Sequence, residues 1–433
     1  MRIVQISQQD EGSGGFKAAL RLHRSLIQAG QDSRLVVLSK TTNTSGVMGL
    51  VRPNLLAKIT WRLLGMLNNW ELRRYSQKPR CGWTASDYSI GALRTIRRMK
   101  PDVVQLHLFD CVLTYEDVAR IPAPVFWTFH DMGAITGGCH CTPDCLRYKT
   151  GCGCCPELGS TEENDASRRG WDTKRKAWSH TCMTGIAPSR WLEREALDSP
   201  MCSGHPIVRI PNGVPLDVFR PDVRQEARAK MGFKGSTFYL LAGSSSLDNE
   251  LKGFAFVAEA AQQLAARHPG RFELVTFGRG KPDIVGVPVR HQGYLRNDDA
   301  LACLYAACDA YVLPSLVDNL PNMLIESIAC GTPCVTFNVG GCPDVVRDGL
   351  TGFIAHERSG ESLVYCIARI IQMSNDVRRG LRLRCREVAL AEYGLETMAA
   401  AYFKAYSQHF ENKVKSEVGF IGCEIACPAL DCG

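Results

Sequence analysis

The stretch VVQLHLFDCVLTYEDVARIPAPVFWTFH, residues 103–130, begins and ends with short runs that are almost entirely apolar. These runs, Val103–His107 and Val125–Phe129, have the length of β-strands. Strands of this composition are typical of a parallel sheet that is covered by helices on both faces. The stretch therefore predicts part of a buried parallel sheet.

The flanking sequence continues this pattern in both directions. Further strand candidates in the first half are Ile3–Ile6, Arg34–Leu38 and Met183–Ala187, and the helix candidates are Lys17–Ala29, Leu55–Tyr75, Ile90–Met99 and Glu162–Ser179. In the second half the strand candidates are Phe238–Ala242, Phe272–Phe277, Ala310–Leu313 and Pro333–Phe337, and the helix candidates are Phe254–Arg267, Asp298–Ala307, Pro321–Ala329, Glu361–Met373, Asp376–Glu392 and Leu395–Glu411. This alternation predicts βαβ units in both halves.

A proline-rich segment separates the two halves, with Pro206, Pro211, Pro215 and Pro221. Prolines in this density predict a boundary or hinge. We therefore expect two doubly wound, Rossmann-like parallel-sheet α/β domains, residues 1–205 and 206–394, which face each other across a cleft. A helix at 395–412 is expected to pack back on the N-terminal domain, and residues 413–433 form a tail. Ligands of such sheets bind beyond the carboxyl ends of the strands.

The composition excludes several classes of protein. The chain has 433 residues, of which 45% are hydrophobic and 22% are charged, so it is neither disordered nor collagen-like. Its net charge of +7 is uneven, because residues 51–100 hold eleven Lys/Arg and two acidic residues, Glu71 and Asp87. No apolar run reaches the length of a membrane span, and the N-terminus reads directly as a core strand. We therefore expect a cytoplasmic protein.

A glycine-rich segment follows the first predicted strand. In Glu11–Phe16, the residues Gly12, Gly14 and Gly15 allow an anion to approach the backbone closely at a helix N-terminus. The spacing is neither G-x-G-x-x-G nor a P-loop with its lysine. A tight strand–helix turn without a ligand remains an equally good interpretation.

Two acidic residues stand eight positions apart in PSLVDNLPNMLIE, residues 314–326. Asp318 lies in a loop after a predicted strand, and Glu326 lies inside the next helix. A carboxylate can accept hydrogen bonds from a pair of sugar hydroxyls. The spacing alone is also compatible with a solvated helix face, but the surrounding Pro, Asn and Gly residues make the pattern more specific.

This segment resembles the E-x7-E region of retaining GT-B glycosyltransferases of family 4, with Asp318 in the place of the first glutamate. The resemblance extends over most of the chain. It includes PSLVDNLPNMLIESIACGTPCV, GGCPDVVRDGLTGFI, APSRWL and IPNGV, and the Cys-rich stretch at 127–158 is most similar to exopolysaccharide enzymes of the colanic acid type. The resemblance implies transfer of a hexose from a UDP- or GDP-linked sugar to a saccharide acceptor, lipid-linked in surface polysaccharide synthesis, without a catalytic metal.

The resemblance also implies roles for individual residues. Glu326 would bind the ribose hydroxyls of the donor, and Asp318 would contact the transferred sugar. Donor contacts are further expected from Gly14, Gly15, Asn319, Leu320, Pro321 and Asn322. Family members clamp the diphosphate with an Arg and a Lys; Lys252 matches the lysine, whereas the arginine position falls on Ser244 or Ser245, and Arg279 is a candidate replacement.

His130 ends a predicted buried strand at the cleft. A lone histidine in such a place is more often structural than catalytic. The resemblance aligns it with a histidine that approaches the donor sugar, and we therefore include His130 with Asp318 as the catalytic candidates. Domain closure would exclude water and favour transfer over hydrolysis.

Six cysteines lie between residues 139 and 155. The resemblance supports four of them, Cys139, Cys145, Cys152 and Cys155, whereas Cys141 and Cys154 are additions in this chain. Four thiolates in one loop suit a closed, structural zinc site. Free thiols, disulfides or an iron–sulfur cluster are the alternatives.

The basic window contains a predicted amphipathic helix, with Leu55, Ile59, Leu63, Met66 and Leu67 at helical spacing and Lys58 and Arg62 on another side. One interpretation is an ordinary core-facing helix. The other is peripheral docking to an anionic membrane on its inner face, where a lipid-linked acceptor lies. No nucleic-acid-binding motif accompanies the charge.

Two other functions are compatible with this architecture. A nucleotide-sugar epimerase would use the same fold and donor site. A non-catalytic, metal- and nucleotide-binding regulator would be built around the cysteine loop.

Overall fold

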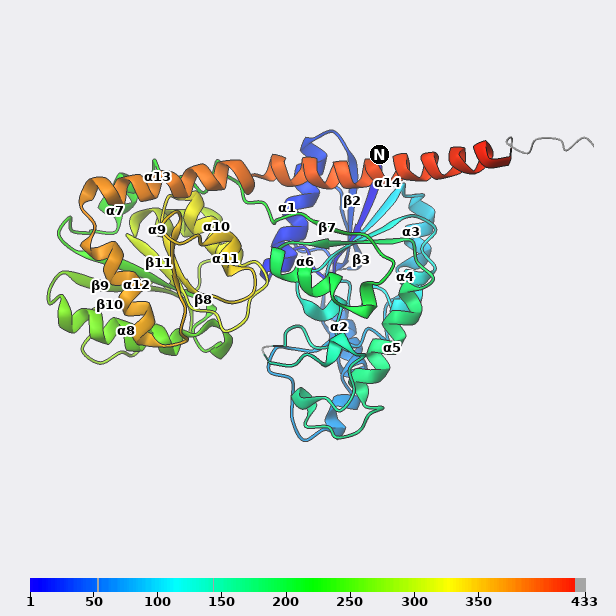
Figure 1. The fold of residues 1–433 in the computed structure, drawn as a ribbon, viewed down its shortest axis with the longest axis horizontal. Coiled ribbons are helices and arrows are strands. Elements are labelled where there is room, and N and C mark those ends of the chain that lie inside the picture. The colour runs from blue at the N-terminus through cyan, green and yellow to red at the C-terminus, as the bar shows by residue number, and fades with distance from the viewer. Residues whose placement is uncertain (53, 143, 425–433) are drawn as a thin grey trace, which may run out of the picture.

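The computed structural model describes residues 1–424 with the exception of Pro53 and Pro143. Within this range the chain forms two α/β domains that lie side by side (Figure 1). Each domain is built on one parallel sheet with its own hydrophobic core. The predicted fold class is therefore confirmed.

The N-terminal sheet has seven strands in the described chain, in the order β3-β2-β1-β4-β5-β6-β7. Every neighbouring pair is parallel. The strands are β1 (Arg2–Ile6), β2 (Asp32–Ser39), β3 (Val47–Val51), β4 (Val103–Leu106), β5 (Val125–Thr128), β6 (Met183–Ala187) and β7 (Ile207–Arg209). The helices of this domain are α1 (Gly14–Gln28), α2 (Leu55–Asn68), α3 (Leu93–Met99), α4 (Tyr115–Ala119), α5 (Ala166–Trp178) and α6 (Arg190–Leu197).

The C-terminal sheet has six strands among the described residues, in the order β10-β9-β8-β11-β12-β13, and is also parallel throughout. The strands are β8 (Phe238–Ser246), β9 (Phe272–Arg279), β10 (Val289–His291), β11 (Ala310–Leu313), β12 (Cys334–Phe337) and β13 (Gly352–Ala355). The helices are α7 (Arg224–Lys230), α8 (Phe254–Arg267), α9 (Asp298–Ala307), α10 (Asn322–Ala329), α11 (Cys342–Val345), α12 (Gly360–Gln372) and α13 (Asn375–Glu392). Short 3-10 helices lie at Glu71–Arg74, Met132–Ala134, Arg147–Lys149, Pro156–Leu158, Pro200–Cys202 and Glu250–Lys252.

Several elements differ from the sequence expectation. Strand β7 pairs with β6, so the N-terminal sheet continues past residue 205. The strands β3, β7, β10 and β13 were not predicted; they are the edge strands of the two sheets, and each is only three to five residues long. The expected helix Leu55–Tyr75 ends at Asn68 and is followed by a 3-10 turn at Glu71–Arg74.

The long helix α14 (Leu395–Glu424) starts at the C-terminal domain and crosses to the N-terminal one (Figure 1). There Tyr402 and Tyr406 are buried, and their hydroxyls form hydrogen bonds with Thr128 Oγ1 (2.7 Å) and Gln105 Oε1 (2.8 Å). The helix extends beyond residue 412, into the segment expected to be a tail, and residues 425–433 lie outside the described residues.

Asp309, the residue immediately before β11, anchors helix α7 to the C-terminal sheet. Its carboxylate accepts hydrogen bonds from Arg224 Nη2 (2.6 Å) and from the backbone N–H of Tyr239 (2.9 Å), and Arg228 lies 3.4 Å away. The Asp309 side chain is only 6% exposed. Loss of this carboxylate would leave two arginines without their charge partner beside a buried strand.

We expect Asp309→Ala to lower the free energy of unfolding of the C-terminal domain by about 3 to 5 kcal/mol, because it breaks a buried ion pair. Urea denaturation measures this change. Asp222→Ala is the matched control, since the Asp222–Arg220 pair is exposed and worth less than about 1 kcal/mol. Equal destabilisation by both variants would contradict the anchoring role of Asp309.

Candidate functional site at the interface of the two domains

Loops at the carboxyl ends of the two sheets meet at the interface between the domains. Asn319 Nδ2 donates to the backbone carbonyls of Phe129 (2.9 Å) and His130 (3.2 Å). Asn322 Nδ2 donates to the carbonyl of Gly14 (3.1 Å). The predicted residues Gly14, His130, Asn319 and Asn322 are therefore brought together, although they come from opposite halves of the sequence.

The approach at the glycine-rich turn is close. A Cβ atom on Gly15 would lie 2.8 Å from the Leu108 side chain and 3.2 Å from the His130 ring. A side chain at this position would require the end of Leu108 to move and the His130 ring to give way by a few tenths of an ångström. The packing around the site therefore favours glycine at position 15, but it assigns no ligand to it.

Helix α10 begins at this interface. Pro321 is its N-cap residue, and Asn322 is its first helical residue. Leu320, also predicted as a donor contact through its backbone, is buried in the C-terminal core. Unpaired N–H groups and the positive end of the helix dipole at such a terminus favour an anion, such as a phosphate.

Two predicted site residues form an ion pair with each other. Lys252 Nζ lies 2.5 Å from Asp318 Oδ2, and Ser315 Oγ donates to the same oxygen (3.1 Å). Lys252 follows β8 and Asp318 follows β11, which are adjacent strands. This arrangement holds one cation and one carboxylate next to the N-terminus of α10.

Arg279 at the end of β9 has a different neighbour. Its guanidinium lies 4.7 Å from the ring centroid of Tyr294, in a cation–π arrangement. Ser244, at one of the two positions where the family resemblance places an arginine, donates its hydroxyl to the carbonyl of Ser246 (2.8 Å). The contacts of Arg279 therefore give no support to its predicted role as the replacement diphosphate clamp.

Glu326 lies one turn into α10 and is only 3% exposed. Its Oε1 accepts a hydrogen bond from Arg21 Nη2 (2.9 Å), which comes from α1 of the other domain. Burial raises the pKa of Glu326, and the charge of Arg21 opposes that rise. Sequence reasoning missed Arg21, because nothing in a helical arginine indicates a partner in a distant domain.

His130 is part of a buried histidine pair that sequence reasoning also missed. His107 Nδ1 lies 3.0 Å from His130 Nε2, and His107 Nε2 lies 2.9 Å from Gln5 Oε1. Both histidines come directly after a strand or two residues beyond it, at the ends of the similar runs VVQLH and VFWTFH, and this similarity is the signal that could have indicated His107.

Burial lowers the pKa of His130 to about 4, and it also lowers the pKa of His107. Both rings are therefore neutral near pH 7. Because the Gln5 oxygen can only accept, His107 carries its proton on Nε2 and accepts at Nδ1 from the Nε2–H of His130. This tautomer leaves Nδ1 of His130 as a hydrogen-bond acceptor.

A cavity beside this pair lies in the N-terminal domain. It is lined by both histidines and by Asp110, Asp131 and His140. His140 Nε2 is 2.7 Å from Thr84 Oγ1, and the Thr84 hydroxyl donates to Asp110 (3.1 Å). The other ring nitrogen of His140, Nδ1, is 3.6 Å from Asp131. A second groove, lined by Trp61, Arg62, Asn69 and Trp83 among others, also includes Thr84 and Asp110 in its lining.

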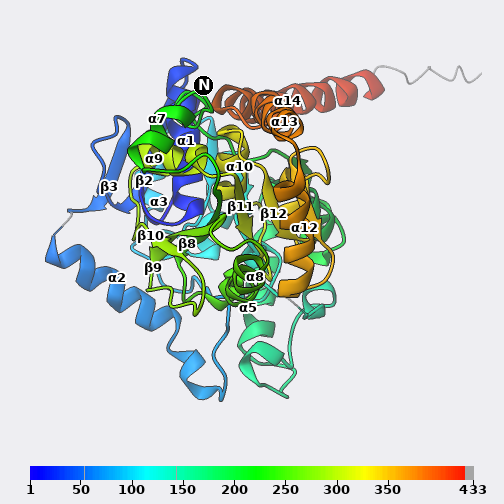
Figure 2. The same ribbon diagram turned by 90° about the vertical axis from the view of Figure 1, so that its left-hand side faces the viewer.

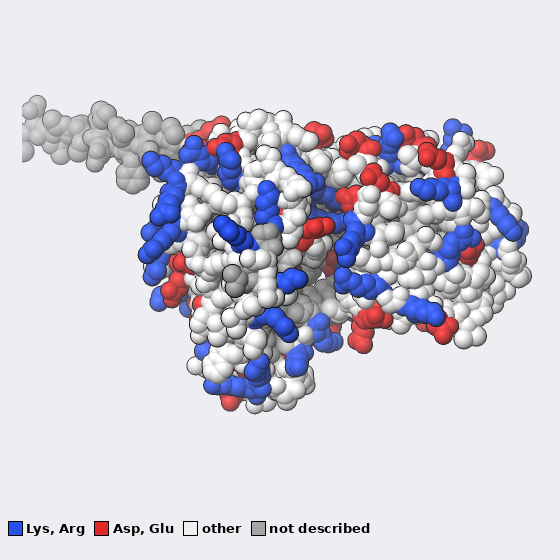
Figure 3. Space-filling view, turned by 180° about the vertical axis from the view of Figure 1, so that it is seen from behind, with Lys and Arg blue, Asp and Glu red and all other residues white. Residues whose placement is uncertain are grey.

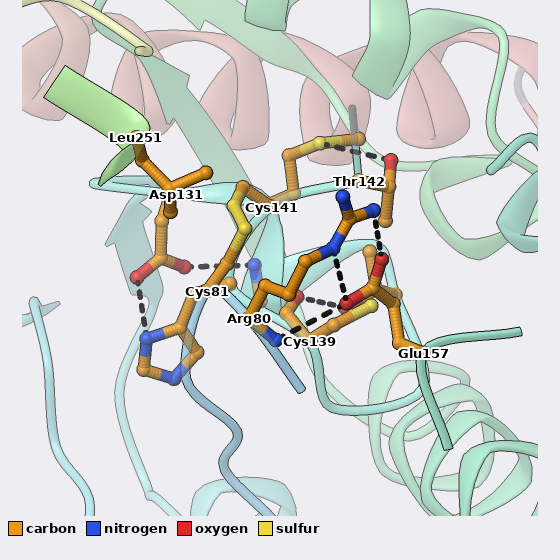
Figure 4. The surroundings of a disulfide bond; sticks show 12 residues. Arg80, Cys81, Asp131, Cys139, Cys141, Thr142, Glu157 and Leu251 are labelled. Carbon is orange, nitrogen blue, oxygen red and sulfur yellow. Dashed lines mark hydrogen bonds and ion pairs between the residues drawn. A yellow bond between two sulfur atoms is a disulfide. The ribbon is translucent and has the colours of Figure 1, made fainter. Parts of the chain in front are cut away.

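The structure separates the six clustered cysteines into different environments. Cys139, Cys145, Cys152 and Cys155 line one small cavity. Cys141 instead forms a disulfide with Cys81, and the loops that carry it lie next to Asp131 (Figure 4). The thiol of Cys154 points to Thr161 O (3.4 Å) and Glu163 (3.5 Å).

Known proteins resemble this chain in sequence and in fold. The family description "Glycosyl transferases group 1" matches residues 239–373. A D-inositol 3-phosphate glycosyltransferase of Actinosynnema mirum is 32% identical over 34% of this chain and 39% of its own length. A putative colanic acid biosynthesis glycosyl transferase, WcaC of Escherichia coli K12, is 24% identical over 80% of this chain and 85% of its own.

The first curated relatives are thus matched over less than half of their own length. Two solved structures share the complete fold. The sucrose-phosphate synthase of Thermosynechococcus elongatus has a TM-score of 0.63 at 15% identity, covering 95% of this chain and 100% of that one. HepE of Anabaena, in complex with UDP, has a TM-score of 0.61 at 15% identity, covering 94% and 100%.

The matched segment contains Lys252, Asp318, α10 and Glu326, the parts that form the C-terminal side of the interface. The resemblance predicted from the sequence is therefore confirmed: residues 239–373 match the group 1 glycosyl transferases, and the chain has the GT-B fold.

Proposed function

We propose that this chain is a retaining glycosyltransferase that moves a hexose from a UDP- or GDP-linked sugar to a saccharide acceptor in surface polysaccharide biosynthesis. The match of the group 1 family to the domain that contains Glu326 carries this proposal. It is further supported by the similarity to WcaC over most of both chains and by the UDP bound to HepE, which has the same fold.

The chemistry requires stabilisation of a departing diphosphate. The bond between the sugar C1 and the diphosphate oxygen breaks, and the acceptor hydroxyl oxygen bonds to C1. The acceptor oxygen approaches C1 on the side from which the diphosphate leaves, and the acceptor proton passes to the departing diphosphate. The N-terminus of α10 and the Lys252 ammonium would stabilise the negative charge that develops.

The remaining candidates act on the sugar. Asp318 already orients Lys252 and would face the transferred hexose. His130 is neutral at physiological pH because burial lowers its pKa to about 4, so it would accept a hydrogen bond from a sugar hydroxyl rather than supply charge.

We expect UDP or GDP to bind the wild-type protein and Glu326→Gln to weaken that binding roughly tenfold, because hydrogen bonds from the ribose to a charged acceptor are lost. Isothermal titration calorimetry with each nucleotide measures this change. Glu361→Gln, in an exposed part of α12, serves as the control and should bind normally. Failure of the wild-type protein to bind either nucleotide would contradict the proposed function.

The acceptor is proposed to be lipid-linked, and helix α2 is proposed to dock on an anionic membrane surface. Large apolar side chains of α2 and the turn after it are exposed, namely Leu55, Ile59, Trp61, Leu63, Met66, Leu67 and Trp70. The cations Lys58 and Arg62 lie among them in sequence, and Arg73 and Arg74 follow directly after them. Figure 2 shows α2 projecting from the body of the domain, and Figure 3 shows Lys and Arg gathered on the N-terminal domain.

An exposed apolar surface with a cationic rim is typical of helices that lie in the membrane interface. Among the described residues, none of the helices combines the length and the apolar character needed to cross a bilayer. Any attachment through α2 would therefore be of the interfacial kind.

We expect the protein to float with liposomes that contain anionic lipid and not with neutral ones, since both apolar burial and charge contribute. The double variant Trp61→Ser/Leu63→Ser should lose this flotation. Tyr365→Ser, which removes an aromatic side chain that is 68% exposed in the other domain, should not. Equal recovery with both lipid compositions would contradict the proposal.

A structural zinc ion is proposed at Cys139, Cys145, Cys152 and Cys155. These four thiols line one cavity, and the N–H of Gly137 already contacts Cys152 Sγ at 3.2 Å. Such N–H contacts suit a thiolate ligand. In the part of the chain that the structure describes, no three His, Cys, Asp or Glu side chains are gathered as metal ligands, so the loop would have to tighten around the ion.

We expect about one zinc per chain in protein purified under reducing conditions, because four thiolates make a closed site. Elemental mass spectrometry measures the content. Cys152→Ser should remove the metal, whereas Cys154→Ser, outside the cavity, should retain it. Iron with acid-labile sulfide, or no metal in the wild-type protein, would exclude the zinc assignment.

A further inference from the structure

Arg21 forms a buried ionic contact between the two domains. It lies two turns into α1, and its Nη2 is 2.9 Å from Glu326 Oε1 and 3.0 Å from Asp298 Oδ2. The side chains of Arg21 and Glu326 are 8% and 4% exposed. Lys17, one turn earlier on α1, also pairs with Asp298 (3.0 Å). The contact thus connects α1 of one domain to α9 and α10 of the other.

Burial of Glu326 has an electrostatic cost that Arg21 offsets. A carboxylate in an apolar interior tends to take up a proton, because its charged form is poorly solvated. Burial raises the pKa of Glu326, the charges of Arg21 and Lys17 lower it, and Asp298 raises it. Other ionisable groups that interact with Glu326 electrostatically are Tyr305 on α9, Tyr311 on β11 and Cys330 after α10.

The second terminal nitrogen of Arg21 is unsatisfied. Nη1 is buried and has no hydrogen-bond partner among the described residues. A buried guanidinium N–H without an acceptor is costly, and native structures rarely retain one without a reason. An oxygen-rich anionic ligand that binds beside the Arg21–Glu326 pair would provide the missing acceptor.

We propose that Arg21 is a donor-binding residue supplied by the N-terminal domain. Nη2 holds Glu326 Oε1 and keeps the carboxylate ionised, while Oε2 accepts from the ribose hydroxyls. Nη1 donates to an oxygen of the ribose–diphosphate. This inference rests on the proposed function. Arg21 would supply a cation to a donor site in which Ser244 or Ser245 stands at the position where family members have an arginine.

The burial of Glu326 implies the order of events. A ribose cannot reach a side chain that is 4% exposed, so the domains must separate before the nucleotide enters. Closure then brings Arg21 back to Glu326 with the donor between the domains. Nucleotide binding and domain closure are coupled through this arginine, since its contacts on the C-terminal domain exist only in the closed form.

The test compares Arg21→Met, which removes the charge at similar length, with Arg21→Lys, which keeps the charge. Arg97→Met is the control, because Arg97 is an exposed arginine of the same domain, on α3, whose Nη2 donates to the carbonyl of Arg120 (3.1 Å). Binding of UDP and GDP is measured by calorimetry. We expect Arg21→Met to weaken binding of the nucleotide that the wild type prefers by roughly 10- to 100-fold, and Arg97→Met to bind normally.

The pH profile separates this role from a purely structural one. Without Arg21, the pKa of Glu326 rises further, so a larger fraction is protonated near neutral pH and cannot bind the ribose as a carboxylate. Affinity of Arg21→Met should therefore recover as the pH rises from about 6 to about 9. Arg21→Lys should keep the wild-type profile at reduced affinity, which also controls for folding.

Unchanged or tighter nucleotide binding by Arg21→Met would overturn the inference, and so would weakened binding with an unaltered pH profile. If the wild-type protein binds neither nucleotide, the proposed function fails and the inference falls with it. If the wild type binds and Arg21→Met binds equally, only the inference fails.

Discussion

The closeness of two helices, α1 and α10, is the constraint on which the interface depends. Their N-terminal ends meet where Asn322 donates to the carbonyl of Gly14, and one to two turns further on Arg21 contacts Glu326. Two helix N-termini in one place concentrate positive potential, which is favourable for a diphosphate. A side chain at Gly15 would disturb the contact between the helix N-termini, and loss of the charge at Arg21 would disturb the ionic contact further along the two helices.

Several polar side chains are buried in the parallel sheet of the N-terminal domain. Gln5, Gln105, His107 and Thr128 lie on its strands or directly after them and are all buried. They are satisfied through Ser33, through His130 and through the hydroxyls of Tyr402 and Tyr406 on α14. Gln105 and Thr128 thereby join the sheet to α14, which begins in the other domain, whereas Gln5 and His107 lead to His130.

The sequence predicted the elements best where local patterns were strong. The buried strands β4 and β5, the helices α8 and α9, and the glycine turn before α1 were placed within a few residues. Short edge strands such as β7 and β10 were missed, because three residues carry too little periodicity to be distinguished from a loop. The role of Arg279 stays a prediction; its guanidinium lies over the ring of Tyr294, a contact that the sequence around Arg279 does not encode.

By itself, the sequence determined the α/β class, the family resemblance and the identity of Glu326, Lys252, Asp318 and His130 as candidates, because these depend on patterns within short segments. Only the tertiary structure decided which residues meet. Arg21 and Glu326 are separated by 305 positions, and His107 and Gln5 by 102. The distribution of the cysteines, with four at one cavity and Cys141 joined to Cys81, likewise depends on chain folding. Such pairings arise when packing removes charges and polar groups from water, and no local pattern encodes them.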